Sequence, residues 1–282
     1  MCTKFVKMIP EDIKVSFNFM TNGIWIKNRD RIIALARKFG GTVGFSYDPV
    51  GRYSTEGQRK IAIENINYVL DELGYVNLAI TATKPNIECI LKGQDEFVKN
   101  MSPRIAVELN SYIPNWDYEV NMPTEELIFE LYKHIIDNGM FMVNVTTQYL
   151  LAAFNMSPIR VSVCDCKASV QYSDNKLVSD CVEKSSCFGI DRFYGKFTKD
   201  RNLENCHDIK MNLAIQKRNC MMCRFFDRCP GFCTASILFD KYQHGECPIK
   251  RLMEYMIQNK DVVLEKFRKY REHNILPHEM QA

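Results

Sequence analysis

Through the first 155 residues, short apolar stretches rich in β-branched and aromatic residues alternate with longer stretches whose apolar positions recur at helical spacing. The pattern predicts strands over 13–20, 42–48, 76–83 and 104–113. It predicts helices over 28–40, 55–74, 85–100 and 124–139. Strands and helices that alternate at this pitch are typical of an α/β fold with a parallel sheet and right-handed crossovers, either open or barrel-like.

The predicted strands run into short polar segments. Their carboxyl ends read TNG, SYD, TATKPN and NSYIPN. Functional groups of parallel sheets gather at the carboxyl ends of the strands, so these segments are candidates for a binding site.

The alternation stops after residue 155. Residues 159–181 predict a hairpin with its turn at 173–175, and a polar stretch of low periodicity follows to residue 219. A helix is predicted from Pro248 to Asn274. The expected organisation is therefore an α/β part over 1–157, an irregular cysteine-rich domain over 158–250, and a C-terminal helix over 251–282.

Cysteine usage separates the two halves of the chain. Of twelve cysteines, only Cys2 and Cys89 precede residue 160, and ten lie from Cys164 to Cys247. A role as small core residues would not concentrate them in this way. We see no signal peptide, so we expect a reducing cytoplasmic setting with thiols rather than disulfides. The cysteine-rich part therefore indicates a metal-binding module.

Charge and hydropathy argue against a nucleic-acid-binding or a membrane-spanning protein. The formal net charge is +3, and no Lys/Arg-rich block would supply a nucleic-acid surface. No run of eighteen uncharged apolar residues is present, so we expect no membrane partner.

Residues 219–233 read NCMMCRFFDRCPGFC, which places four cysteines at the spacing C-x2-C-x5-C-x3-C. Four converging thiolates hold either tetrahedral zinc or a [4Fe–4S] cubane. Cys247 lies fourteen residues beyond Cys233, and Cys166 and Cys181 flank the predicted hairpin. These are more thiols than one tetrahedral site uses. The spacing favours iron–sulfur clusters, with structural zinc and a metal-free role as the alternatives.

The motif, followed by a further cysteine, resembles the SPASM domain of radical S-adenosylmethionine (SAM) enzymes. The preceding C-x9–15-G-x4-C element of that family matches Cys166 and Cys181, except that Lys176 stands in place of the glycine. The segments NFMTNGIWI, VGFSYDPVGR and AITATKPNIE are similar to strands of the radical SAM barrel. The resemblance implies a partial (β/α) barrel followed by a small SPASM domain and a terminal helix.

The C-x3-C-x2-C motif that binds the catalytic cluster of radical SAM enzymes does not occur in this sequence. By the resemblance, the chain would begin near the third strand of the barrel. We therefore expect a truncated, split or derived enzyme, and a possible complementing chain that carries C-x3-C-x2-C. SAM would be a cofactor only if the missing N-terminal half completes the barrel.

The resemblance also implies roles for individual residues. Cys220, Cys223, Cys229 and Cys247 would hold one auxiliary [4Fe–4S] cluster. Cys166, Cys181 and Cys233 would hold a second, with Cys164 as the nearest fourth ligand and Cys187 or an open iron site as alternatives. Ser46 and Arg59 would contact the SAM carboxylate or ribose. No catalytic residue is predicted.

Two functions remain open at this point. The first is the iron–sulfur-binding C-terminal portion of a radical SAM/SPASM enzyme that modifies peptides or proteins, with auxiliary clusters for electron relay or substrate anchoring. The second is a catalytically inactive, cluster- or zinc-stabilised module that binds a peptide or protein at an open sheet edge.

Overall fold

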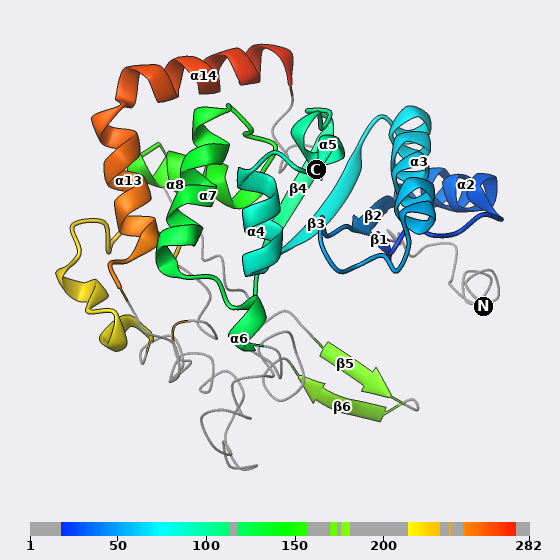
Figure 1. Cartoon of the computed structure of the whole chain (residues 1–282), viewed down its shortest axis with the longest axis horizontal. Helices are drawn as coiled ribbons and strands as arrows, with labels where there is room; N and C mark the ends of the chain where they lie inside the picture. The colour runs from blue at the N-terminus through cyan, green and yellow to red at the C-terminus, as the bar shows by residue number, and fades with distance from the viewer. Residues whose placement is uncertain are drawn as a thin grey trace.

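A computed structural model describes residues 18–112, 118–156, 170–173, 176–180, 214–231, 237 and 245–274. Its main feature is a four-stranded parallel sheet in the order β1-β2-β3-β4 (Figure 1). The strands are β1 (Asn18–Thr21), β2 (Thr42–Ser46), β3 (Val76–Ala82) and β4 (Ile105–Ser111). The intervening helices are α2 (Arg29–Phe39), α3 (Glu56–Leu73), α4 (Lys84–Leu91) and α5 (Glu96–Lys99). The predicted α/β fold with a parallel sheet is confirmed.

The two faces of the sheet differ in character. Because each strand lies beside its predecessor, right-handed crossovers place α2, α3 and α4 on one face. On that face β3 buries Val76, Leu78, Ile80 and Ala82, whereas Asn77, Ala79 and Thr81 between them are half-exposed. The side chains of the second face are mostly small or polar. An order without reversal is typical of a sheet wound in one direction, as in a barrel.

Local signals explain where the helices begin and end. Thr55 and Thr124 accept backbone hydrogen bonds at the starts of α3 and of α7 (Glu125–Asp137). Gly40 and Gly74 end α2 and α3 in the left-handed conformation. These four residues lie at ends of the helices predicted over 28–40, 55–74 and 124–139.

The predicted helix over 85–100 is two helices, so that prediction is wrong in its interior. Gly93 has a left-handed φ of 59° between α4 and α5. Asp95 then caps α5, since its carboxylate accepts the Val98 N–H at 2.9 Å. Gly93 and Asp95 favour non-helical backbone, and this preference outweighs the helical spacing of the apolar residues on either side.

The predicted C-terminal helix is also two helices. α13 (Pro248–Gln258) ends at Asn259, and α14 (Lys260–His273) starts directly after it. Asn259 departs from helical geometry, with φ −108° and ψ 28°. The break lets both helices pack on the core, which contains Leu252 and Met256 of α13 and Phe267 of α14.

The sequence did not predict helices α6 (Tyr118–Asn121) and α8 (Asn144–Ala153). Helix α6 is a single turn, and α8 begins with the β-branched residues Val145, Thr146 and Thr147. These residues have low helix propensity. Tertiary packing decides α8, since Tyr149 and Leu150 are completely buried and α13 packs against it.

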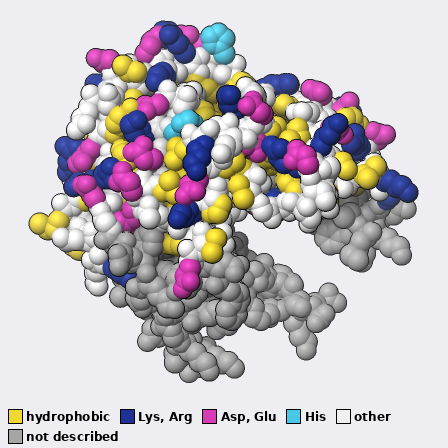
Figure 2. Space-filling model, viewed as in Figure 1, with side chains coloured by type: hydrophobic (Ala, Val, Ile, Leu, Met, Phe, Trp, Pro, Cys, Tyr) yellow, Lys and Arg dark blue, Asp and Glu magenta, His cyan; other side chains and the backbone are white. Residues whose placement is uncertain are grey.

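The antiparallel pairing of the predicted hairpin is confirmed, since β5 (Val170–Ser173) pairs with β6 (Lys176–Asp180). The rest of the predicted hairpin, residues 159–169, 174–175 and 181, lies outside the described residues. One hydrophobic core joins the sheet to α7, α8, α13, α14 and Phe225 of the cysteine motif. No helix in the described part of the chain is both long and apolar enough to cross a membrane. On the face in Figure 2, acidic and basic side chains are interspersed rather than gathered by sign.

Candidate metal centre

The first two motif cysteines lie on a tight turn. Asn219 adopts the left-handed conformation with φ 52°, and a 3-10 turn over Cys220–Met222 follows. The Cys223 N–H donates to the Cys220 carbonyl at 2.9 Å, which closes the turn. Asn tolerates this backbone geometry better than most residues, so Asn219 suits the entry to the turn. The turn brings the backbone of Cys223 against that of Cys220, the two residues of the C-x2-C pair.

The third cysteine follows a second turn built around a buried aromatic ring. Phe225 is buried in the core, and the Cys229 N–H donates to its carbonyl at 2.7 Å. The Gly231 N–H donates to the Cys229 sulfur at 3.4 Å, and the Tyr149 hydroxyl donates to the Gly231 carbonyl at 3.0 Å. Helix α8 thereby anchors the loop that carries Cys229.

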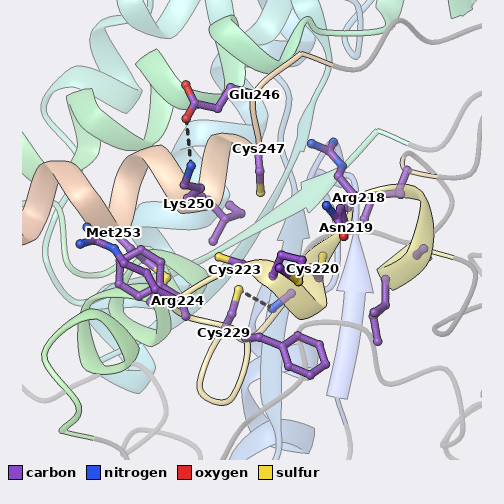
Figure 3. A pocket seen from close by; sticks show the side chains of 18 of the residues that line it. Arg218, Asn219, Cys220, Cys223, Arg224, Cys229, Glu246, Cys247, Lys250 and Met253 are labelled. Atoms are coloured by element: carbon purple, nitrogen blue, oxygen red, sulfur yellow. Dashed lines mark hydrogen bonds and ion pairs between the residues drawn. The ribbon is translucent and has the colours of Figure 1, made fainter.

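A fourth cysteine comes from the start of α13. Cys247 is the N-cap residue, and Pro248 begins the helix. Cys220, Cys223, Cys229 and Cys247 all line one cavity of about 640 Å³. Figure 3 shows Cys247 entering the cavity from α13, opposite the three motif cysteines. The structure thus places together the four residues that the resemblance groups on one cluster.

The thiols of this cavity interact electrostatically. The pKa of Cys229 is raised to about 11: burial and the charges of Cys247, Cys223 and Cys220 raise it, and the hydrogen bond from the Gly231 N–H partly offsets them. If all four cysteines of the cavity were ionised, their negative charges would repel one another. A cation would remove that repulsion and deprotonate the thiols, so the donor set suits a positively charged metal core.

The spacing of the donors bears on which metal fits. Within the described residues, no group of three or more His, Cys, Asp or Glu side chains is arranged as in a metal-ion site. Zinc requires its thiolates at about 2.3 Å, around one point. A cubane gives each thiolate an iron of its own and therefore accepts sulfurs that lie further apart. The preference for a [4Fe–4S] cluster over zinc therefore rests on the spacing of the cysteines in the sequence.

Four other predicted ligands lie outside the described residues: Cys164, Cys166, Cys181 and Cys233. Strand β6 ends at Asp180, directly before Cys181. The proposed second cluster therefore stays a prediction, and so does the division of the motif between two clusters.

Ser46 and Arg59 are not brought together. Ser46 is half-exposed on the open face of the sheet, between the buried Phe45 and Tyr47. The Arg59 guanidinium, on the helix-covered face, donates to the Tyr47 hydroxyl at 3.1 Å and to the Asp95 carboxylate at 2.9 Å. Ser46 therefore faces the region where a ligand of the sheet would lie, whereas Arg59 joins a buried ion pair.

The strand ends are tied by a polar network that the sequence did not reveal. The Asp48 carboxylate accepts from the Thr81 N–H at 2.8 Å, from Asn86 at 3.1 Å and from Arg52 at 2.7 Å. Asn86 in turn accepts the Val50 N–H at 2.9 Å. Asp48 thereby joins the ends of β2 and β3 to the start of α4. An Asp before Pro49 is typical of a turn, and one at a strand end can be functional, but neither interpretation names these partners.

Two more residues of the cavity region were missed. Arg218 lines the cavity and forms an ion pair with Glu125 of α7, and both are buried. Tyr149 holds Gly231, as described above. No spacing in the sequence connects Arg218 to Glu125 or Tyr149 to Gly231, because the partners are far apart in the chain.

Comparison of the chain with protein-family models, with curated proteins and with solved structures finds no match. The cysteine spacing and the geometry of the cavity are therefore the features that indicate a function.

Proposed function

We propose that the chain is an iron–sulfur protein and the C-terminal portion of a radical SAM/SPASM enzyme that modifies peptides or proteins in the cytoplasm. The observation that carries the proposal is the convergence of Cys220, Cys223, Cys229 and Cys247 on one cavity. One sequence segment, residues 220–229, and the start of α13 contribute these thiols. The sheet, with its one-directional strand order and polar open face, is consistent with part of a barrel.

The four cysteines would hold one auxiliary [4Fe–4S] cluster, which supplies one-electron transfer when bound. The surrounding residues serve it in distinct ways. Phe225, buried in the wall, excludes water from the cavity, and the Gly231 N–H directs a hydrogen bond at the Cys229 sulfur. Hydrogen bonds to sulfur and restricted solvent access tune the reduction potential of a cluster. Tyr149 fixes the position of Gly231 for that purpose.

Anaerobic reconstitution with iron and sulfide tests the proposal. We expect about four irons and four sulfides per chain at this site, with a brown chromophore and the EPR signal of a reduced [4Fe–4S] cluster. Cys223→Ala and Cys247→Ala should each lower iron binding at this site. Cys89→Ala is the matched control, because Cys89 is a buried thiol of α4 outside the cavity and its loss should leave iron content unchanged.

The protein could instead bind one zinc per chain without a chromophore, and lose that zinc when Cys223 or Cys247 is replaced. The cavity would then be a structural zinc site and not a cluster site. An iron content that neither alanine variant lowers would remove the cavity from the proposal. Either result contradicts the assignment of these residues to a cluster.

The edge of the sheet favours a second candidate function. Among the described strands, β1 pairs with β2 alone, which leaves its other edge available for strand addition. Met20 of β1 is an exposed apolar residue. A complementing chain with C-x3-C-x2-C, or a peptide partner without catalysis, would add there. Co-expression with the adjacent reading frames, followed by co-purification and a SAM-cleavage assay, separates these possibilities.

A further inference from the structure

The cysteine cavity has a buried cationic wall. Three cationic side chains line it among the described residues, and two of them are exposed: Arg224 at 59% and Lys250 at 39%. The side chain of Arg218 is only 5% exposed. Water screens exposed charges strongly and buried charges weakly. Arg218 is therefore the cation whose field acts most strongly inside this cavity.

The partner of Arg218 is also buried. Glu125, at 4% exposure, starts α7, where the helix dipole favours a carboxylate. A Cβ atom built on Gly245 would lie 3.5 Å from Oε2 of Glu125, so the carboxylate approaches the segment that leads to Cys247. Arg218 itself precedes Cys220 by two residues. The ion pair thus links α7 to both cysteine-bearing segments.

Stability does not account for this pair. Two charges lose their hydration when they are buried, and replacing a buried ion pair with apolar groups is often neutral or stabilising. A buried pair beside a redox centre has a further effect, because it acts on the charge of that centre. A cubane with four thiolates is an anion, and reduction adds one more negative charge. A cation nearby favours the reduced state, and an anion disfavours it.

We propose that the buried Arg218–Glu125 ion pair sets the reduction potential of the [4Fe–4S] cluster held by Cys220, Cys223, Cys229 and Cys247. The inference rests on the proposed function. Arg218 raises the potential by stabilising the electron that a one-electron donor adds to the cluster. Glu125 moderates that effect and fixes the position of the guanidinium. Both are positioning residues, because neither binds iron.

Potentiometric titration with dithionite, followed by EPR, tests this proposal on reconstituted protein. Arg218→Met should lower the equilibrium constant for reduction at least tenfold, which is about 59 mV for one electron. Glu125→Gln should raise it, because the full charge of Arg218 then acts on the cluster. Arg218→Lys keeps the charge and should stay close to the unmodified protein.

The neighbouring pair Arg251–Glu126 provides the matched control. It joins α7 to α13, and neither Arg251 nor Glu126 lines the cavity. Arg251→Met should leave the potential unchanged. Iron content and circular dichroism of each variant show whether the cluster and the fold are retained.

Opposite shifts for the two charge-removing variants support the proposal, and shifts of the same sign, or none, overturn it. If Arg218→Met loses its cluster, the Glu125→Gln titration decides alone, since that change keeps the shape of the side chain. If the unmodified protein binds no iron, the proposed function fails instead, and the two failures are therefore distinguishable.

Discussion

The buried ion pair between Arg59 and Asp95 provides a stringent test of the fold. Asp95→Asn removes the charge but keeps an oxygen that can accept the Val98 N–H, so the cap of α5 is preserved. Breaking a fully buried pair costs roughly 3–5 kcal/mol. Arg59 is 23% exposed and has a second partner in Glu56, so water and that carboxylate compensate part of the loss. We expect a decrease of about 2 kcal/mol in the free energy of unfolding.

Urea unfolding followed by circular dichroism measures this loss for the metal-free protein. Glu56→Gln is the matched control, because Glu56 contacts the same guanidinium but is 78% exposed. That variant should lose less than about 0.5 kcal/mol. Equal effects of the two variants, or a loss below about 0.5 kcal/mol for Asp95→Asn, would refute the reasoning that burial decides the strength of this pair.

Three other changes test separate parts of the core. Gly23→Ala should lower stability by about 1–3 kcal/mol in thermal unfolding, because φ is +75° and the new Cβ would lie 2.9 Å from the ring of Phe45. Leu252→Ala, at a completely buried site, should cost about 2–5 kcal/mol in urea unfolding. Burial alone would raise the pKa of Asp137, but hydrogen bonds from Tyr255 and Lys133 outweigh burial and lower the pKa. Its stabilisation is therefore present above the unfolded value of about 3.9 and lost as pH falls through the folded pKa, so Asp137→Asn should flatten the acid dependence of unfolding.

The sequence by itself determined the alternation of strands and helices and many of their ends. Thr55, Thr124, Gly40 and Gly74 are local signals, because a cap acts on backbone groups within one turn of itself. Parallel pairing follows from the alternation, since a strand after a crossover helix returns in the same direction. The spacing of the cysteines also singled out the motif at 220–233 before any geometry was known.

Only the tertiary structure decided how these pieces meet. Helix α8 forms against its own low propensity, because burying Tyr149 and Leu150 contributes more free energy than its first turn loses. The position of Arg59 was decided in the same way: a buried carboxylate at Asp95, 36 residues away, holds its guanidinium on the covered face. Spacing within a motif is a local property, whereas a cavity shared by Cys247 and three cysteines of an earlier segment depends on how α13 packs against α7 and α8. The structure alone places Arg218 beside Glu125, because two charges 93 positions apart share a buried site only once the whole core has closed around them.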